Sequence, residues 1–438
     1  MSAKTGTSGA RQQRLTSYLN RLTEAAGHAD RAVPIRLYCT GLLLPGERKS
    51  VEPMAARLAP GNVRRMHQSL HHVVADAAWS DEALLGCTRD YALAAMTRSS
   101  PVAAWIVDDT RLPKKGTHSV GVARQYCGQT RKQDNCQVVV SLSVATWTAS
   151  LPVAYRLYLP EAWANDSQRR QQARIPNDIV FQTKLEIALG QIRRAIADGI
   201  PQGTVLADPA YGNDTAFRDK LAELELSYVL GIQSTTTVWP PGTQPLPAPR
   251  YSGRDQSANR VRHDLEHAPV SAKQLALALE PKAWKTVTWW EGTRRPLRSR
   301  FATVRICPAH CDLKLTQPRE QELLLIEWPR GETEPHKYWL SNLAENIRLR
   351  DLVALAKQRW IIERDYEELK QELGLGHFEG RGWRGFHHHA TLCIAAYGFL
   401  VAERSRFSPS ARGGHLGLPV PELPPKFQPR GSHPSGTA

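Results

Sequence analysis

The stretch RWIIERDYEELK, residues 359–370, places one acidic residue between two basic residues on one side of a predicted helix. It consists of good helix formers and contains neither Gly nor Pro. At about 3.6 residues per turn, one helix face carries Arg359, Glu363, Tyr366 and Lys370 in that order. A face of this kind is also typical of an exposed helix stabilised by ion pairs, each worth about 0.3 kcal/mol. Carboxylates elsewhere in the chain decide whether this face belongs to a functional site or is only an exposed surface.

Two other segments end in acidic residues after a short apolar run. PVAAWIVDD ends in Asp108 and Asp109, and GTVLAD ends in Asp208. Both apolar runs predict buried strands with carboxylates at their C-terminal tips. An Asx turn is the structural alternative for each, since a lone Asp at the end of a strand commonly forms one. Because ligand sites of open α/β sheets lie beyond the C-terminal ends of strands, adjacent tips would bring these acids together.

The order of elements around these acids predicts the fold class. The first predicted strand, ending at Asp109, and a basic loop are followed by strands at 136–147 and 151–160, a helix at 178–199, a strand at 203–208, a helix at 214–225 and a strand at 227–232. Consecutive strands followed by alternating units predict an α/β protein with a mixed sheet covered by helices. Residues 101–232 would form the first part of this core, and the acidic helix within residues 342–404 would form the second part.

Three flanking segments have other patterns. Residues 1–100 contain amphipathic helical segments and no strand pattern, which predicts a separate helical domain. Residues 233–341 contain a loop rich in Pro and Gly, followed by strand patterns rich in Trp, which predict an all-β insertion. Residues 405–438 are dominated by Pro, Gly and Ser, which predicts a disordered tail.

One helix of the N-terminal segment is strongly basic. It carries Arg64, Arg65, His67, His71 and His72. Such a face either contacts DNA or is a solvated surface, and the sequence favours neither interpretation.

The charge balance favours a polyanionic partner. The chain of 438 residues has 57 Lys and Arg against 42 Asp and Glu, a formal net charge of +15, which is typical of proteins that bind nucleic acid. No apolar run of roughly 18 residues predicts a transmembrane helix, and the N-terminus lacks the apolar segment of a signal peptide. We therefore expect a cytoplasmic protein with no membrane contact. The seven cysteines are scattered, which argues against a disulfide framework, and CPAHC at 307–311 fits no common zinc pattern.

Three carboxylates that converge in a basic protein predict a two-metal site. Mg²⁺ prefers oxygen ligands and keeps several waters, so a few carboxylates suffice to bind it. Two such ions roughly 4 Å apart activate an attacking oxygen and stabilise the leaving oxygen in phosphodiester transfer. Without a cation among them, carboxylates this close would repel one another. Arg359 and Lys370 would flank the acidic residue and bind nearby phosphates.

Four stretches together resemble DDE transposases of bacterial insertion sequences. They are WIVDDTRLPKKG, ARQYCG with the strands after it, LADPAYG, and RWIIERDYEELKQELGLGHFEGRGWRGFHHH, spanning about residues 100–400. The chain is most similar to the branch with an RNase H-like core, a β insertion before the last acid and a Y-R-E-K signature. In LADPAYG the Tyr follows the acid by three residues, as in that family. Arg359, Glu363 and Lys370 have the spacing of the signature's R, E and K.

The resemblance implies a role for each matched acid. Asp109 corresponds to the first catalytic acid because Thr110 follows it, and Asp108 is the alternative first acid. Asp208 corresponds to the second acid and Glu363 to the third. Together the three acids would hold two Mg²⁺ or Mn²⁺ ions.

The signature is incomplete in one place. Its Tyr belongs three residues before Arg359, where this chain has Ala356. Tyr366, on the same helix face, is a candidate substitute. The departure concerns a phosphate contact rather than the metal site, and the resemblance still implies that Arg359 and Lys370 bind DNA phosphates. The histidines at 387–389 match family sequence and have no expected metal role.

The resemblance implies a transposase that cuts and joins the ends of its own element. Water and then a DNA 3′-hydroxyl would attack phosphorus in line, without a covalent protein intermediate. The partners would be double-stranded DNA, as element ends and as target, and a second copy of the chain in a homodimeric end complex associated with the bacterial nucleoid. The alternatives are a catalytically idle relative that only binds DNA and a metal-dependent endonuclease without strand transfer.

Two further expectations concern DNA contacts outside the core. Aromatic rings of the predicted insertion are candidates for stacking on an extruded base, as in hairpin-forming relatives, and the alternative is that they are packing aromatics. The candidates are Trp239, Trp284, Trp289 and Trp290. Residues 1–100 would recognise the element ends, with binding that weakens steeply as salt increases.

Overall fold

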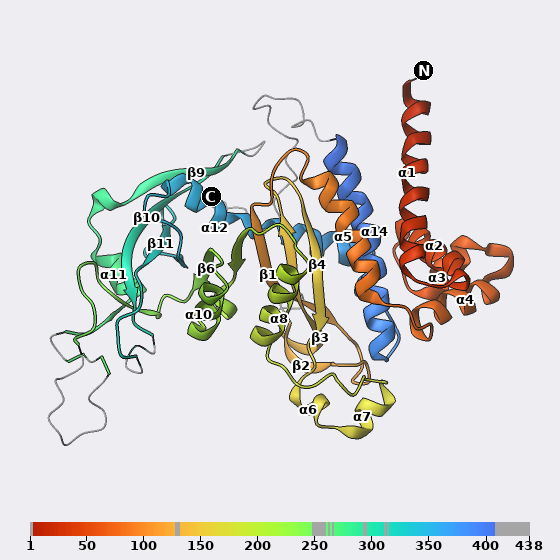
Figure 1. The fold of residues 1–438 in the computed structure, drawn as a ribbon, viewed down its shortest axis with the longest axis horizontal. Coiled ribbons are helices and arrows are strands. Elements are labelled where there is room, and N and C mark those ends of the chain that lie inside the picture. Colours follow the sequence, from red (N-terminus) through yellow and green to blue (C-terminus); the bar gives the residue numbers. More distant parts are fainter. Residues whose placement is uncertain are drawn as a thin grey trace, which may run out of the picture.

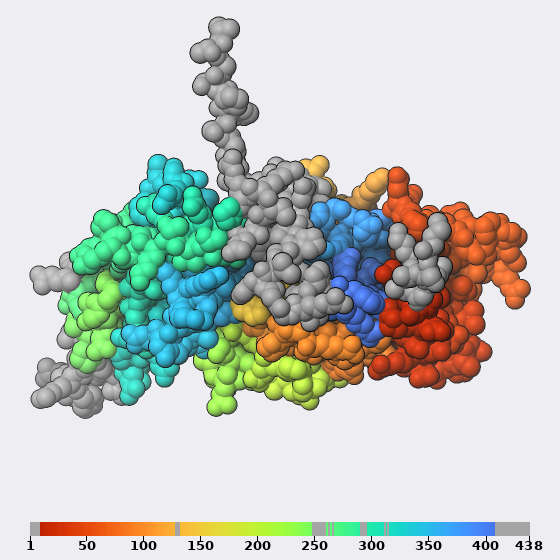
Figure 2. Space-filling view, turned by 90° about the horizontal axis from the view of Figure 1, so that it is seen from above, coloured from red at the N-terminus to blue at the C-terminus, as the bar shows by residue number. Residues whose placement is uncertain are grey.

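A sheet runs through the middle of the molecule, between a helical end and a β-rich end (Figure 1). The computed structural model describes residues 3–127, 132–247, 260–261, 263–264, 267–291, 296–310, 312 and 315–407, without the side chains of 3–8, 290 and 291. The space-filling view shows the same two ends on either side of the core (Figure 2). The predicted disordered tail falls, from residue 408 on, outside the described residues. No helix among them is long and apolar enough to cross a bilayer.

Five helices precede the first strand: α1 Ala3–Ala25, α2 Ala29–Leu43, α3 Val51–Leu58, α4 Val63–Ala75 and α5 Asp81–Met96, with the short 3₁₀ helix η1 Pro60–Asn62 before α4. Side chains cap α2, α4 and α5, because His28 accepts a hydrogen bond from the Asp30 amide, Asn62 from the Arg65 amide and Ser80 from the Ala83 amide. α5 lies along the last helix, α14, Trp383–Phe407 (Figure 1). Buried residues of both helices belong to one apolar core that continues into the sheet.

Six strands form the central part of the sheet: β1 Ala104–Pro113, β2 Ala123–Cys127, β3 Lys132–Ala145, β4 Ser150–Leu157, β5 Thr204–Ala207 and β6 Tyr228–Ile232. The hydrogen-bonded order is β4-β3-β1-β5-β6, and β2 pairs with the first residues of β3. β1 is antiparallel to β3 but parallel to β5, which is parallel to β6. This mixed open sheet confirms the predicted α/β class, and its strand order is consistent with an RNase H-like core.

β1 is longer than the sequence predicts. It continues through Asp108 and Asp109 to Pro113, because its pairing with β3 runs along its whole length. The parallel pairing with β5 ends at Ile106. The prediction that the two acids stand at the tip of the strand is therefore wrong. They lie within β1, just beyond the last residue that β5 pairs, and strand β2 lies within the predicted basic loop.

Helices cover both faces of this sheet (Figure 1): α8 Lys184–Ala197, α9 Pro209–Gly212, α10 Thr215–Glu223, α12 Leu349–Gln358 and α13 Ile361–Gln371. The short helices α6 Glu161–Ala164 and α7 Ser167–Gln172 lie beyond the end of the sheet, near β2. α8 covers one face, where Gln191 donates a hydrogen bond to the Val140 carbonyl. α12 and α13 cover the other face, where they bury Ile106. Because side chains alternate along a strand, Asp108 points to the α12–α13 face and Asp109 to the α8 face.

The predicted insertion extends the same sheet. It comprises β7 Thr237–Trp239, β8 Val270–Ser271, α11 Ala272–Ala278, the 3₁₀ helix η2 Pro281–Ala283, β9 Lys285–Glu291, β10 Pro296–Pro308, β11 Glu322–Trp328 and β12 Lys337–Ser341. β12 pairs with β6 in antiparallel orientation, so the β-rich end continues the central sheet. The all-β prediction is wrong at α11. This helix begins with a capping box, in which Ser271 and Gln274 each satisfy the other's backbone amide.

The predicted continuous helix around Arg359 is interrupted between α12 and α13. There the Trp360 amide donates to the Lys357 carbonyl, and the Glu363 amide donates to the Trp360 carbonyl. Both hydrogen bonds span three residues, as in a 3₁₀ helix. Arg359 therefore caps the end of α12. Glu363 lies in the first turn of α13, where the helix dipole favours a carboxylate.

Candidate active site

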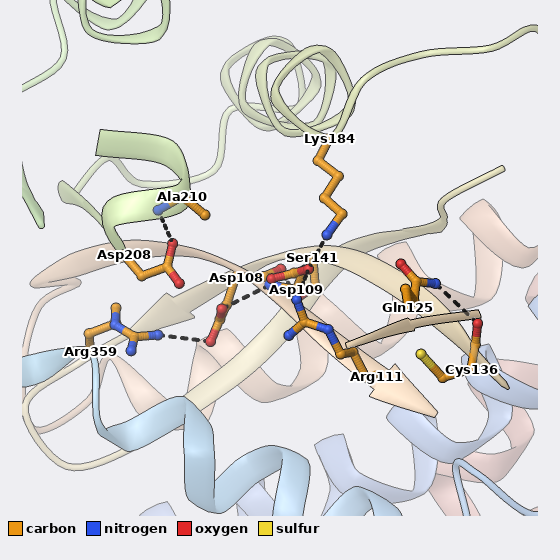
Figure 3. A network of polar contacts seen from close by, with 10 residues as sticks. All are labelled: Asp108, Asp109, Arg111, Gln125, Cys136, Ser141, Lys184, Asp208, Ala210 and Arg359. Atoms are coloured by element: carbon orange, nitrogen blue, oxygen red, sulfur yellow. Dashed lines mark hydrogen bonds and ion pairs between the residues drawn. The ribbon is translucent and has the colours of Figure 1, made fainter. Parts of the chain in front are cut away.

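Asp108 forms the centre of a charged cluster on the α12–α13 face of β1 (Figure 3). Its Oδ2 accepts a hydrogen bond of 2.9 Å from Arg359 Nη1, and its Oδ1 accepts one of 2.9 Å from the Asp109 amide. Burial raises the pKa of Asp108 to about 6, and Arg359 opposes this shift, whereas the nearby charges of Asp208 and Asp109 add to it. Asp108 is therefore a desolvated carboxylate that depends on one cation.

Asp208 follows β5 and faces the same cluster (Figure 3). It is the N-cap of α9, because its Oδ1 accepts a hydrogen bond of 2.9 Å from the Ala210 amide while Pro209 starts the helix. The sequence LADPAYG also fixes α9 against β6. A Cβ at Gly212 would overlap the carbonyl oxygen of Gly231, so only glycine allows this close approach. The motif thereby places Asp208 where β1 has lost its pairing with β5.

Glu363 completes the cluster through Arg359. Its Oε1 lies 3.9 Å from Arg359 Nη2, one helical turn away. Burial alone lowers the pKa of Arg359, but the carboxylates of Asp108, Asp208 and Glu363 outweigh burial and raise this pKa. One guanidinium thus interacts with three carboxylates from three separate elements. The structure brings together Asp208, Glu363 and the alternative first acid Asp108.

Asp109, the acid that the family motif favours as the first, points the other way (Figure 3). Its Oδ2 lies 2.6 Å from Lys184 Nζ at the start of α8 and 3.5 Å from Arg111 Nη2. Only 6% of its side chain is exposed, against 31% for each of the two cations. The neighbouring acids of β1 therefore have different partners, and Asp109 lies on the opposite side of the strand from Arg359.

The hydroxyl of Tyr211 is buried beside these acids. Tyr211 is the Tyr of LADPAYG and is 1% exposed. Its hydroxyl has no hydrogen-bond partner among the described residues. Burial raises the pKa of Tyr211, and the charges of Asp109, Asp108 and Asp208 raise it further, in that order. An unused donor therefore adjoins the carboxylates.

Buried polar contacts fix α13 against the sheet. The Tyr366 hydroxyl donates to Ser141 Oγ, and Ser141 Oγ donates to the Asp108 carbonyl over 3.4 Å. Two residues from Glu363, the carboxylate of Asp365 accepts hydrogen bonds from Ser150 Oγ at 2.5 Å and Tyr397 at 2.7 Å. These contacts tie the helix that carries Glu363 to β3, β4 and α14.

The same contacts correct the expectation for the missing signature Tyr. Tyr366 is only 8% exposed and its hydroxyl is bound to Ser141, so it does not substitute as a phosphate contact. Ala356 is buried in the apolar cluster beneath α12. The position therefore has no open pocket for a Tyr, which a closely packed core would not accommodate without strain.

The three histidines at 387–389 are buried and make contacts within the protein. His388 contacts the carbonyls of Val74 at 3.0 Å and Trp79 at 3.1 Å, and its ring stacks on that of Trp79 at 3.6 Å between centroids. His389 contacts the hydroxyl of Tyr38 at 2.8 Å. These buried rings join α14 to the N-terminal helices.

Three of the tryptophans predicted to stack on a base, Trp239, Trp284 and Trp289, pack against other side chains. Trp239 is 1% exposed and donates to Asp312 Oδ2 at 2.8 Å, so the prediction is wrong for this residue. Trp284 packs edge-on against Trp328. Trp289 lies against the buried ammonium of a lysine on α12. The side chain of Trp290 lies outside the described residues.

Three further basic residues lie near the site: Lys370, which the sequence predicts, and Lys184 and Arg111, which it does not. Lys370 lies in the last turn of α13 and is half-buried. Sequence reasoning missed Lys184 and Arg111. One signal was available for Lys184, because a cation at the first position of a helix opposes the helix dipole and calls for another explanation.

Two comparisons relate the chain to known proteins. A sequence model of the family described as DDE superfamily endonuclease matches residues 18–296, which include Asp108, Asp109 and Asp208 and end before Glu363. The probable transposase for insertion sequence element IS701 from Microchaete diplosiphon is 30% identical over 168 residues, or 38% of this chain and 41% of that relative. The alignment thus spans less than half of the relative's length.

Proposed function

Because the chain belongs to the DDE superfamily endonucleases, we propose that it is a transposase that cuts and joins DNA at the ends of an insertion sequence. The observation that carries this proposal is the convergence of the Asp108, Asp208 and Glu363 carboxylates on the guanidinium of Arg359. Similarity to a probable insertion-sequence transposase supports the choice of DNA substrate. The net charge of +15 fits a polyanionic partner.

The chemistry of the donor set fits hard divalent cations. The three carboxylates offer only oxygen ligands, and the unpartnered Tyr211 hydroxyl adjoins them. When bound, two Mg²⁺ or Mn²⁺ ions would polarise the phosphodiester and activate the attacking oxygen. In the described ranges no three His, Cys, Asp or Glu side chains are already arranged to hold a metal ion. We attribute the lack of such an arrangement to Arg359, which lies among the acids. When DNA binds, Arg359 would leave the carboxylates and contact a DNA phosphate instead.

We assign the first acid to Asp108 rather than Asp109. Asp108 shares Arg359 with the other two acids, whereas Asp109 already has two cationic partners. A metal ligand has to be free of competing cations, and only one guanidinium would have to leave Asp108. Asp108, Asp208 and Glu363 would then hold the metal ions.

Arg359 and Lys370 would bind the phosphates of the strand being cut. Both lie on the connected helices α12 and α13, and a guanidinium offers the paired donors that a phosphate accepts. Holding the phosphodiester in line with the attacking oxygen is the main contribution that such residues make to phosphoryl transfer. Water would attack first and a DNA 3′-hydroxyl second.

The proposal also assigns the parts of the chain. Residues 101–232 and 342–404 would form an RNase H-like catalytic core, residues 233–341 its insertion and residues 405–438 a tail. Residues 1–100 would recognise element ends, with the exposed Arg64 and Arg65 of α4 on the DNA. Two copies of the chain would hold two ends, in the nucleoid, and then join them to target DNA.

The test combines the protein, Mg²⁺ and DNA carrying the ends of the element, and maps the products by sequencing. Transposase activity predicts nicks at the element boundary and joined target products, both lost in Asp108→Asn. An endonuclease without strand transfer would yield cuts but no joined products. Binding without any cut in Mg²⁺ or Mn²⁺ would identify an idle DNA-binding relative and overturn the proposal. Deleting residues 1–100 should abolish preference for end DNA over random DNA.

A further inference from the structure

The α8 face of β1 carries a second charged cluster, which we call the Lys184 cluster. It consists of Asp109, Arg111, Lys184 and Tyr211 (Figure 3 shows the first three). The proposed function uses none of these residues directly. Two cations contact one carboxylate, and both of them can donate hydrogen bonds to an oxyanion.

The two cations of the Lys184 cluster converge on one oxygen atom. Lys184 Nζ and Arg111 Nη2 lie 2.6 Å and 3.5 Å from the same Oδ2 of Asp109. About a third of each cationic side chain is exposed, whereas Asp109 is nearly buried. Asp109 therefore contacts both cations on their buried side, and the exposed part of each cation can contact a ligand in solvent.

Lys184 occupies a position that helix formation does not explain. It is the first residue of α8, where the helix dipole disfavours a cation. Thr183 and Glu186 already form a complete capping box there. The contact with Asp109, on the same face of the sheet, is what holds the ammonium in this position.

Two donors of the Lys184 cluster are unused. Arg111 Nε and the Tyr211 hydroxyl are buried and have no hydrogen-bond partner among the described residues. A buried donor without a partner is unfavourable, so each of these donors would gain from an added acceptor. Tyr211 is 1% exposed, and among the nearby carboxylates the charge of Asp109 contributes most to raising its pKa.

We propose that the Lys184 cluster is a binding subsite for a backbone phosphate of DNA, and that Asp109 is a positioning residue that holds Lys184 and Arg111 in it. The inference rests on the proposed function, because the phosphate belongs to the DNA that the neighbouring acids would cut. A phosphate diester suits the cluster because it is an oxyanion that accepts several hydrogen bonds. A second metal site does not, because two cations already surround the carboxylate.

The test measures DNA binding rather than cleavage. Fluorescence anisotropy in Ca²⁺ would give the affinity of wild type, Lys184→Met, Arg111→Met and Asp109→Asn for an end duplex. We expect Lys184→Met and Arg111→Met each to bind about tenfold more weakly, as expected for the loss of one charged hydrogen bond. Lys220→Met is the matched control, since Lys220 is 44% exposed on α10 and pairs with Glu223. Lys184→Arg keeps the charge and should bind nearly as wild type.

A phosphate-specific measurement separates a contact from a general loss of charge. A series of end duplexes would each carry one neutral methylphosphonate near the cut. One position should weaken binding to wild type about tenfold and should have no further effect on Lys184→Met. Wild-type binding by Lys184→Met, or undiminished sensitivity at every position, would overturn the subsite. Cleavage that survives Asp108→Asn would instead overturn the proposed function, so the two failures are distinguishable.

Discussion

Asp108 and Asp109 are adjacent and identical in chemistry, yet they face opposite sides of β1. Asp108 faces α12 and α13 and shares the Arg359 guanidinium with Asp208 and Glu363. Asp109 faces α8 and is held by two cations of its own. Because successive side chains of a strand point to opposite faces, these two adjacent acids belong to two separate sites. On one side three carboxylates share a single guanidinium, and on the other side two cations contact a single carboxylate.

The difference in charge determines which ligand each side can bind. On the Asp108 side, burial raises the pKa of Asp108 to about 6, and one guanidinium serves three carboxylates. An added divalent cation would relieve the repulsion there. On the Asp109 side, the cations exceed the single carboxylate, and an added phosphate would balance them. A reaction on DNA phosphodiesters would use both kinds of site, and β1 carries one on each of its faces.

The largest expected effect is the loss of an acid on the Asp108 side. Asp208→Asn should lower the cleavage rate roughly a thousandfold, because the metal ions would lose an anionic ligand and their stabilisation of the transition state. Rates of nicking on an end duplex would measure this. Asp198→Asn is the control, because Asp198 lies at the far end of α8 and pairs with Arg194. Wild-type cleavage by Asp208→Asn would show that this side does not carry the chemistry.

The next effect concerns how α12, which presents Arg359, is held. Lys357 on α12 is largely buried. Its Nζ lies 2.6 Å from Glu327 Oε2 and 4.4 Å from the centre of the Trp289 ring. Lys357→Met would leave the Glu327 carboxylate buried without its cation, and we expect a loss of roughly 3 kcal/mol in unfolding free energy. Chemical denaturation would measure it, with Lys357→Met/Glu327→Gln as the variant that should recover most of the loss.

The same pair predicts a pH dependence. Burial lowers the pKa of Lys357 from 10.5 to about 8 in the folded protein. Between these two values the unfolded chain binds more protons than the folded one, so the wild type should gain stability as pH rises from 8 to 10.5. Lys357→Met should lack this gain. Parallel slopes of unfolding free energy against pH for the two proteins would show that the ammonium is not buried as described.

Loss of Arg359 should have an intermediate effect. Arg359→Ala should weaken formation of the end complex or slow cleavage about tenfold, equivalent to about 1.4 kcal/mol, because a phosphate contact is lost. The unfolding free energy should also fall, because Asp108 would lose its one cation, so both assays are run well below the melting temperature. Electrophoretic mobility of the end complex and nicking rates would measure the two parts. Normal binding and cleavage by Arg359→Ala would show that the α12–α13 junction is an ordinary charged helix surface without a role in DNA binding.

The smallest expected effect concerns the contact that seats α13. Tyr366→Phe removes the hydroxyl that donates to Ser141, and Ser141 itself donates to the Asp108 carbonyl. We expect a loss of about 1 kcal/mol in unfolding free energy. The readout that separates positioning from stability is the Mn²⁺ affinity, which should fall even well below the melting temperature. Unchanged affinity would mean that Tyr366 only packs.

Much of this comparison could be predicted from local patterns. The acids, the strand before Asp208 and the helix with Glu363 follow from hydrophobic runs and spacing. Two serines alternate with apolar residues in β3, at Ser141 and Ser143, and mark the face that meets α13. What local patterns do not determine is which face each helix covers. For that reason Thr110 favoured Asp109 as the first acid, whereas in the structure it is Asp108 that contacts Arg359.

Other features depend on contacts between distant segments. The break after Arg359 contains neither Gly nor Pro, so it follows from how α12 and α13 pack on the sheet rather than from helix propensity. β1 extends beyond its apolar run because β3 pairs with it through Pro113. Tyr366 is buried because Ser141 lies opposite it, at a separation of 225 residues in sequence. None of these partners is visible in a window of sequence.

The most direct test of the account is the metal affinity of two neighbouring variants. Isothermal titration with Mn²⁺ would be carried out on wild type, Asp108→Asn and Asp109→Asn, each bound to an end duplex that cannot be cut. The account predicts that Asp108→Asn binds Mn²⁺ at least about tenfold more weakly. Asp109→Asn should bind Mn²⁺ as wild type while holding the duplex less tightly. Loss of Mn²⁺ binding in Asp109→Asn together with its retention in Asp108→Asn would contradict the division between the two faces of β1.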